Sequence, residues 1–274
     1  MYRDRKIGAV VLAYNVQSHV SGVLDAMPGY VDAVYVVDDA SADLTADAIR
    51  GWCSNGEGST GVASPYPYVR FIQHPENRGP GAALSSGYAH AMNDGMDIVV
   101  KVDGDNQMDL GEMERLLEPI VNGEADYAKG DRLSSAALRR GMPRFRLVGN
   151  LLLTRLTRIA SGNRRLTDSQ NGYTAISRRA LMTIGWNLYP YYGYLNELLV
   201  RLNAHGLAVA DVPMVARYGP EQSSIRLRWY VPRVSALMLR LFLWRVTRRR
   251  RACSACAVGG GTCDIERRNV VKVL

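Results

Sequence analysis

The chain has 274 residues, of which 47% are hydrophobic and 22% are charged, and its formal net charge is +8. These values are typical of a folded globular protein and exclude extensive disorder. Four cysteines are too few for a disulfide scaffold in a chain of this length. The N-terminus has no apolar signal segment, and no uncharged apolar run reaches the roughly 18 residues that a spanning helix needs. We therefore expect a cytoplasmic protein with reduced thiols.

The positive charge is concentrated near the C-terminus. Residues 226–251 contain nine arginines and no acidic residue, and without these nine the chain has 25 basic and 26 acidic residues. Such a patch is suited to an anionic partner, either lipid headgroups or nucleic acid. No nucleic-acid recognition motif accompanies the arginines, so we expect no nucleic-acid partner.

Strand-like and helix-like segments alternate along the first hundred residues. We expect strands at 7–12, 33–37, 68–73 and 97–102, helices at 16–27, 41–50 and 80–94, and an inserted loop at 54–67. The strands are almost continuously apolar, which indicates a parallel sheet covered by helices on both faces. Ligands bind such α/β sheets at the carboxyl ends of the strands.

The second half of the chain is less regular. We expect helices at 109–121, 143–160, 193–204 and 229–247, a strand at 207–215, and a strand pair or irregular segment at 165–177. No internal repeat or interdomain linker is visible in the sequence. The predicted organisation is one domain over residues 1–228, a basic amphipathic helix over 229–251 and a weakly structured tail over 252–274.

The sharpest motif is the stretch Asp-Gly-Asp-Asn-Gln at 103–107, directly after a predicted strand. The carboxylates of Asp103 and Asp105 can reach one hard cation, with Gln107 as a third oxygen ligand. Mg2+ or Mn2+ prefers such oxygen sites and leaves positions open for substrate phosphates. The alternative is an acidic turn between a strand and a helix, because Asp and Gly favour turns.

Two more turns carry polar or glycine-rich patterns. Asp38-Asp39-Ala40-Ser41 follows the second strand, where a carboxylate can accept hydrogen bonds from a base or a ribose, or where Ser41 or Asp43 can cap the next helix. The stretch 77–83 is glycine-rich and precedes a helix, which suits either a phosphate or a structural turn. It lacks the Gly-Lys-Ser/Thr ending of a P-loop.

Together these motifs resemble the family 2 glycosyltransferases in order and spacing. The matching stretches are 10–15, 36–41, 77–82, 103–107, 130–132, 168–172 and the surroundings of Glu197, and the resemblance covers residues 6–226. The chain is most similar to the dolichyl-phosphate mannose synthase branch. The resemblance implies a GT-A fold, an α/β nucleotide-sugar-binding fold with a mostly parallel sheet and helices on both faces.

The resemblance also implies a donor site in two parts. The nucleotide base and ribose would be lined by Leu12, Tyr14 and Asp39. The metal and the diphosphate would be held by Asp103, Asp105 and Gln107, with Gly104 between the two carboxylates. Where the family has Pro-x-Tyr-Asn-Glu, this chain has a turn that ends in Val16, and the missing glutamate leaves the nucleotide open.

On the acceptor side, Arg132 matches the basic residue of the family's Gly-Ser-Arg motif and would face a phosphate. Arg217, with Gly219 and Ser223, resembles the family's flexible acceptor loop, in which Arg226 would replace the expected lysine. These arginines are suited to binding anions.

The need for a general base depends on the acceptor. An acceptor hydroxyl must lose a proton, for which Asp168 or Glu197 is the candidate base. A lipid monophosphate is already ionised and needs no base, and Asp168 would then organise the site around the arginines. We expect four residues to be required for catalysis: Asp105, Arg132, Asp168 and Glu197.

The arginine-rich segment 229–251 predicts a helix that lies in the membrane interface. At 100° per residue, Arg233, Arg240 and Arg248 fall on one arc together with Leu237 and Trp244. The alternative is a helix docked on the domain and followed by a solvated basic tail. The cysteines that follow, Cys253, Cys256 and Cys263, have no nearby histidine to complete a zinc site, and lipidation beside a membrane helix is the other interpretation.

We therefore predict an inverting, metal-dependent glycosyltransferase that moves a sugar from a nucleoside diphosphate to a polyprenyl phosphate. It would use Mg2+ or Mn2+ and act as a peripheral protein at the cytoplasmic face of a membrane. The alternatives are a transferase of the same fold that acts on a saccharide or lipid hydroxyl, a sugar nucleotidyltransferase, and a non-catalytic binding module. The chain lacks the phosphate loop of a nucleotidyltransferase, and its complete acidic motif argues against a degenerate site.

Overall fold

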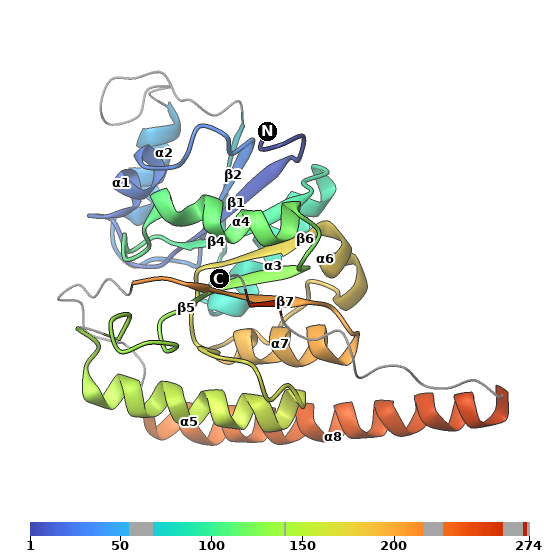
Figure 1. Ribbon diagram of the computed structural model, residues 1–274. Helices are drawn as coiled ribbons and strands as arrows, with labels where there is room; N and C mark the ends of the chain where they lie inside the picture. Colours follow the sequence, from blue (N-terminus) through green and yellow to red (C-terminus); the bar gives the residue numbers. More distant parts are fainter. Residues whose placement is uncertain (55–67, 140, 216–226, 260–270, 273–274) are drawn as a thin grey trace.

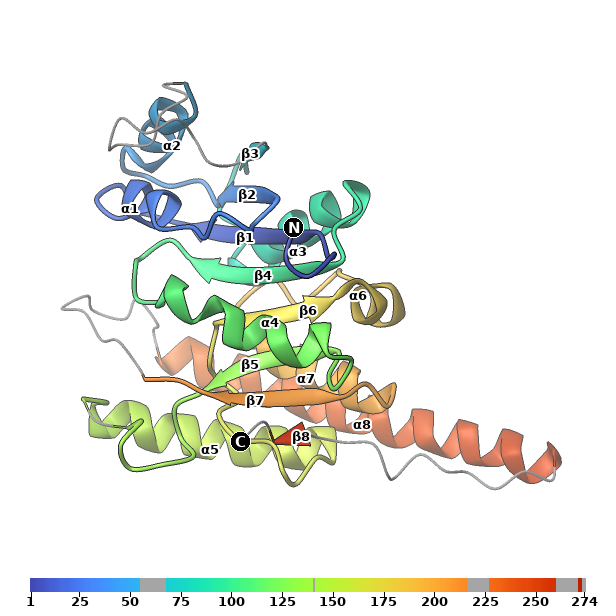
Figure 2. The ribbon, with the colours of Figure 1, turned by 45° about the horizontal axis from the view of Figure 1, so that its top comes forward.

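The computed structural model describes residues 1–54, 68–139, 141–215, 227–259 and 271–272. Its centre is an eight-stranded sheet in the order β3-β2-β1-β4-β6-β5-β7-β8 (Figures 1 and 2). The strands are β1 (Ile7–Ala13), β2 (Ala33–Asp38), β3 (Val69–Gln73), β4 (Ile98–Asp103), β5 (Tyr127–Asp131), β6 (Thr174–Ser177), β7 (Val209–Pro213) and β8 (Val271–Lys272). All neighbours pair in parallel except β6, which is antiparallel to both β4 and β5.

Helices cover both faces of this sheet. They are α1 (Val20–Asp25), α2 (Thr45–Ser54), α3 (Pro80–Asn93), α4 (Met113–Val121), α5 (Arg144–Ser161), α6 (Arg178–Ile184), α7 (Tyr194–Ala204) and α8 (Leu227–Gly259). Helices α1, α2 and α4 contribute to one apolar core, and α3, α6 and α7 contribute to the other. Within β1, Val11 belongs to the first core and Val10 to the second, as expected for a strand that is buried on both faces. The predicted α/β class is confirmed.

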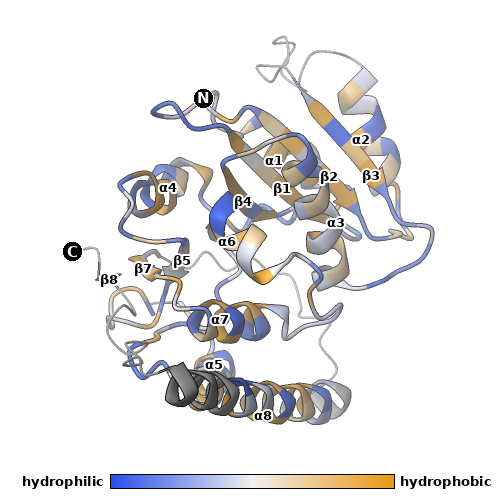
Figure 3. Ribbon diagram, turned by 90° about the vertical axis from the view of Figure 1, so that its right-hand side faces the viewer, coloured by the Kyte–Doolittle hydropathy of each residue, from blue (hydrophilic) through white to orange (hydrophobic). Residues whose placement is uncertain are grey.

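Helices α5 and α8 form a further layer. They lie side by side beyond α7, and α8 runs along the lower border of the molecule in Figure 3. Val234, Leu237, Met238 and Leu241 of α8 are buried in a third apolar cluster with Ala160 and Val200, which come from α5 and α7. The helix is therefore docked on the domain, and Leu237, predicted to share the arginine arc, faces inward.

The C-terminal helix is longer than the sequence predicts. Residues 252–259, predicted to open a weakly structured tail, continue α8 to Gly259. They are mostly alanine and other small residues without proline, so nothing in their composition interrupts a helix before the glycines that begin at 259. None of the described helices is long and apolar enough to cross a membrane.

Strand β5 and helix α6 were absent from the predicted elements. The strand reads Tyr-Ala-Lys-Gly-Asp, which is polar enough to resemble a loop, yet all five residues are buried. Burial of its charges is possible because Lys129 forms an ion pair with Asp211 of β7, and Asp131 accepts hydrogen bonds from the backbone N–H groups of Leu133 and Ser134.

Candidate active site

A broad cavity of about 1610 Å³ opens at the carboxyl ends of β1, β2 and β4. Eight of the predicted site residues line it: Leu12, Tyr14, Asp39, Asp103, Gly104, Asp105, Gln107 and Arg132. The parallel strands bring these residues together from distant positions in the sequence, as the strand ends predict. Two predicted residues, Asp168 and Glu197, are not part of this lining. Arg217 and Arg226, with the rest of the acceptor loop, lie outside the described residues.

Asp39 connects the end of β2 to the glycine-rich turn. Its side chain is buried, and its Oδ2 accepts a hydrogen bond of 2.7 Å from the backbone N–H of Gly79, while Oδ1 accepts one of 2.9 Å from Arg78. Oδ1 also lies 2.7 Å from Nδ1 of His74. The carboxylate therefore fixes the turn at the cavity edge, in addition to lining the cavity.

The glycine-rich turn packs closely against the backbone of Tyr189 and Pro190. Pro190 O accepts hydrogen bonds from the backbone N–H groups of Gly81 and Ala82, at the start of α3. A Cβ at Gly81 would lie 1.9 Å from Tyr189 O, so only glycine fits there. The sequence allowed either a phosphate-binding turn or a structural turn. The contacts of the first turn of α3 with Tyr189 and Pro190 are those of a structural turn.

The acidic motif is held rigidly at the end of β4. Gly104 donates a hydrogen bond of 2.9 Å to Leu12 O, and a Cβ on Gly104 would come within 2.9 Å of that oxygen. Asp105 Oδ1 accepts a hydrogen bond of 3.0 Å from the N–H of Gln107, across Asn106 with its φ of 59°. Both carboxylates and the amide thus belong to one tight turn that lines the cavity.

This donor set suits Mg2+ or Mn2+. It consists of hard oxygen atoms, and among the residues that the structure describes no group of three or more His, Cys, Asp or Glu side chains could hold a metal ion by itself. Mg2+ is commonly held by one or two carboxylates together with substrate phosphates, so a site with two carboxylates and an amide fits a cation that arrives beside a diphosphate.

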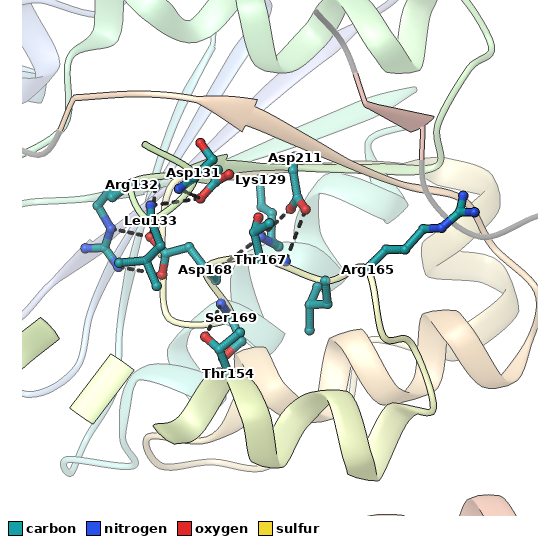
Figure 4. Close-up of polar contacts among 12 residues, drawn as sticks. Lys129, Asp131, Arg132, Leu133, Thr154, Arg165, Thr167, Asp168, Ser169 and Asp211 are labelled. Carbon is teal, nitrogen blue, oxygen red and sulfur yellow. Dashed lines mark hydrogen bonds and ion pairs between the residues drawn. The ribbon is translucent and has the colours of Figure 1, made fainter. Parts of the chain in front are cut away.

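Asp168, which lies outside the cavity lining, holds the Arg132 side chain in place (Figure 4). The Nε of Arg132 donates a hydrogen bond of 2.6 Å to Asp168 Oδ2, and its Nη2 donates one of 3.0 Å to Oδ1. Asp168 is fully buried, and Lys129 Nζ donates to its backbone carbonyl at 2.9 Å. Burial alone raises the pKa of the Asp168 carboxyl, but the Arg132 and Lys129 charges and the Arg132 hydrogen bonds outweigh burial and hold this pKa below its ordinary value.

Glu197 is also committed to protein partners. Its carboxylate accepts hydrogen bonds of 2.5 Å from the N–H of Tyr189 and 2.7 Å from Arg201, and only 2% of the residue is exposed. It anchors the segment that brings Tyr191 and Tyr192 to the cavity. Neither Glu197 nor Asp168 belongs to the cavity lining, and the carboxylate of each is already bound by an arginine of the protein, so in this structure neither is placed to act as a general base.

Several lining residues were missed by the sequence reasoning. The charged ones are Lys101, Asp109, Glu112, Arg115 and Arg146, and the large apolar or aromatic ones include Phe145, Leu153, Tyr191, Tyr192 and Tyr230. Most belong to no recognisable motif, and those on α5 and α8 reach the cavity only through the packing of these helices in the fold. Lys101 did carry a signal, since it is the one charged residue between Ile98 and Val102 in an otherwise apolar strand.

Comparison with known proteins gives a family. The model of "Glycosyl transferase family 2" matches residues 9–185. The chain is 28% identical over 219 residues to the UDP-N-acetylglucosamine–dolichyl-phosphate N-acetylglucosaminyltransferase of Methanococcus voltae, covering 78% of this chain and 87% of the relative. It is 28% identical over 192 residues to the undecaprenyl-phosphate mannosyltransferase of Micrococcus luteus, covering 69% and 73%.

Solved structures share the fold. The crystal structure of glucosyl-3-phosphoglycerate synthase from Mycobacterium tuberculosis in complex with UDP superposes with a TM-score of 0.63 at 22% identity, covering 88% of this chain and 80% of that one. The relatives are consistent with the dolichyl-phosphate mannose synthase branch that the motifs indicate. The chain belongs to glycosyl transferase family 2, and it is a nucleotide-sugar-dependent glycosyltransferase with a GT-A fold.

Proposed function

We propose that the protein transfers a sugar, with inversion, from a nucleoside diphosphate sugar to a polyprenyl phosphate. The observation that carries this proposal is the division of the cavity lining. All the lining carboxylates come from the end of β4 or from the segments that follow β2 and β4, together with two basic residues, Lys101 and Arg115. The segment after β5 and helix α5 contribute Arg132 and Arg146 and no acidic residue. The carboxylates are Asp39, Asp103, Asp105, Asp109 and Glu112. A donor diphosphate with its cation suits the first group, and an anionic acceptor suits the second.

The cation would be Mg2+ or Mn2+, held by Asp103, Asp105 and Gln107, and it would neutralise the charge of the departing diphosphate. Structures of the mycobacterial glucosyl-3-phosphoglycerate synthase in complex with UDP and Mn2+ or Mg2+ support this choice. Leu12 and Tyr14 would flank the nucleotide, and Asp39 would hold the adjoining turn in position and accept from the ribose.

The acceptor phosphate would bind between Arg132 and Arg146, with Arg217 and Arg226 of the acceptor loop as further anion ligands. Asp168 orients Arg132 by the two hydrogen bonds described above. The apolar side chains around them, such as Leu153 of α5 and Tyr192, suit an isoprenoid chain. The names of the relatives from Methanococcus voltae and Micrococcus luteus support a polyprenyl phosphate of this kind.

The reaction would be one displacement. An oxygen of the acceptor phosphate forms a bond to the anomeric carbon, the bond from that carbon to the diphosphate oxygen breaks, and the diphosphate leaves with the electron pair. The acceptor is ionised near neutral pH, so no side chain has to remove a proton. Arg132 and Arg146 would balance the acceptor's charge as the two anions approach.

Exposed side chains on α5 and α8 support a peripheral position at a membrane surface, which we propose to be the cytoplasmic face. Large apolar side chains are exposed there, among them Phe145 at 70%, Leu152 at 58%, Leu239 at 60% and Leu243 at 53%. Arg155, Arg240 and Arg248 on the same two helices are exposed as well. Apolar side chains bordered by arginines are typical of surfaces that bind anionic lipid.

The test is transfer of label from radioactive UDP-N-acetylglucosamine, UDP-glucose and GDP-mannose into the organic phase, with Mn2+, with and without polyprenyl phosphate. Label that requires the lipid phosphate and is lost in Asp105→Asn supports the proposal. Arg146→Gln should raise KM for the lipid and leave binding of the nucleotide unchanged. Label that instead appears on a lipid or saccharide hydroxyl would refute the proposed acceptor.

A further inference from the structure

Lys101 is a buried lysine just before the acidic motif at 103–107, the proposed metal motif. It lies in β4, is only 1% exposed, and still contributes to the cavity lining. Lys101 and Asp103 are two residues apart on one strand, so their side chains share a face of the sheet. The Nζ of Lys101 donates a hydrogen bond of 2.5 Å to Oδ1 of Asp103, and the two groups form an ion pair.

The neighbouring chain keeps this pair together. A Cβ on Gly172 would come within 2.6 Å of Lys101 Nζ and 3.1 Å of Asp103 Oδ2, so the backbone at Gly172 packs directly against both groups. Because Lys101 is only 1% exposed, water screens its ammonium weakly, and the charge interacts strongly with its surroundings. Lys101 is therefore a fixed part of the motif.

The Lys101 ammonium lowers the affinity that we expect of the acidic motif for a free divalent cation. Of the two carboxylates, Asp103 forms an ion pair with Lys101, which offsets part of the negative charge of the motif. A free divalent cation would compete with Lys101 for Asp103 Oδ1 and would be repelled by the ammonium at close range. A diphosphate brings negative charge and oxygen ligands, and thereby offsets both effects.

We propose that Lys101 makes metal binding depend on the nucleotide: it weakens the binding of a free divalent cation, so that the cation enters together with the nucleoside diphosphate. The inference rests on the proposed donor and cation of this site, but not on the proposed acceptor. Lys101 acts through Asp103 and is a positioning residue. The coupling is reciprocal, since a nucleotide that strengthens cation binding is itself bound more tightly when the cation is present.

The test measures free Mn2+ from its electron paramagnetic resonance signal during titration of the wild type and of Lys101→Met, each alone and with UDP or GDP. Without nucleotide, Lys101→Met should bind Mn2+ about tenfold more tightly than the wild type, because a repulsive charge is removed. The factor by which nucleotide strengthens Mn2+ binding should shrink in the variant. Equal or weaker binding of Mn2+ by Lys101→Met, or a nucleotide effect that does not shrink, overturns the inference.

Three variants control the measurement. Lys101→Arg keeps the charge and should retain the weak binding of the wild type, and Lys101→Gln repeats the neutral substitution if Lys101→Met does not fold. Lys129→Met removes the other buried lysine, which pairs with Asp211, and should destabilise the protein without changing its affinity for Mn2+. Tighter Mn2+ binding by Lys129→Met would show a general effect of lost buried charge and would also overturn the inference.

The acceptor assay separates this inference from the proposed function. If Mn2+ and nucleotide are coupled through Lys101 but no label reaches polyprenyl phosphate, the proposed acceptor fails and the inference stands. If transfer to the lipid phosphate occurs but Lys101→Met leaves Mn2+ binding unchanged, only the inference fails.

Discussion

The ion pair between Arg132 and Asp168 gives the most direct test of the site's architecture. Asp168→Asn keeps the size of the side chain but removes the charge that two guanidinium hydrogen bonds engage. Asp168 is fully buried, and the Arg132 side chain is 19% exposed, so water can replace little of the lost interaction. Removing one partner of a buried ion pair costs about 3 to 5 kcal/mol, and the residual exposure of Arg132 places this pair near 3 kcal/mol.

Urea unfolding followed by circular dichroism measures this change. With a slope of about 3 kcal/mol per molar urea, the midpoint of Asp168→Asn should fall by about 1 M at neutral pH. The matched control is Asp47→Asn, which breaks the exposed pair with Arg50 and should leave the midpoint unchanged. A shift at Asp168→Asn no larger than that of the control would refute the assigned role of the pair.

The stability difference between the wild type and Asp168→Asn should depend on pH in a definite direction. The pKa of Asp168 is held below its ordinary value of 3.8, so its contribution to stability is fully present above that value. The contribution is lost as the pH falls through the lower pKa of the folded state. The difference in unfolding free energy between the wild type and Asp168→Asn should therefore be constant from neutral pH down to about pH 5 and should shrink below pH 4.

Three other outcomes are expected. Gly81→Ala puts a methyl group against Tyr189 O and should lower the unfolding free energy by about 3 kcal/mol, measured by thermal or urea unfolding; an unchanged stability would contradict the close approach described here. Leu237→Ala leaves a cavity between α8 and the domain and should cost about 3 kcal/mol, whereas a cost near zero would mean that α8 is not docked in solution. The pair of substitutions Leu239→Asp and Leu243→Asp, on the exposed face of α8, should reduce co-sedimentation with vesicles containing anionic phosphatidylglycerol and leave stability unchanged; undiminished sedimentation would remove α8 from the proposed membrane surface.

The sequence predicted the donor half of the site better than the acceptor half. Leu12 and Asp103 lie at the ends of apolar strands and Asp39 directly follows one, and a parallel sheet brings such positions to one edge without further information. Arg146 lies on α5 and Tyr192 in the turn before α7, and the places of both depend on packing between α5, α7 and α8, which no local pattern specifies. The acceptor half therefore required the structure.

Buried charged residues explain the remaining differences between the sequence-based predictions and the structure. Strand β5 was missed because Lys129 and Asp131 make its sequence polar. Asp211, the partner of Lys129, lies far along the chain, whereas Asp131 accepts hydrogen bonds from the nearby backbone of Leu133 and Ser134. Asp168 and Glu197 were the candidate bases for a hydroxyl acceptor, and Asp168 was otherwise expected to organise the arginines. The contacts agree with the second expectation for Asp168, which accepts from Arg132, and they commit Glu197 to Tyr189 and Arg201. Binding such donors is an equally strong reason for a buried carboxylate at those positions.

The reversed direction of β6 has a consequence for how the two halves of the site are joined. Because β6 runs against its neighbours, the chain that enters it, residues 168–172, crosses the edge at which the parallel strands end. One end of this short stretch grips Arg132 through Asp168, and the other end, at Gly172, packs on Lys101 and Asp103. These five residues thus set the spacing between Arg132, the proposed acceptor ligand, and the proposed metal motif. Adding or deleting a residue within them would change that spacing, even with every proposed binding side chain intact.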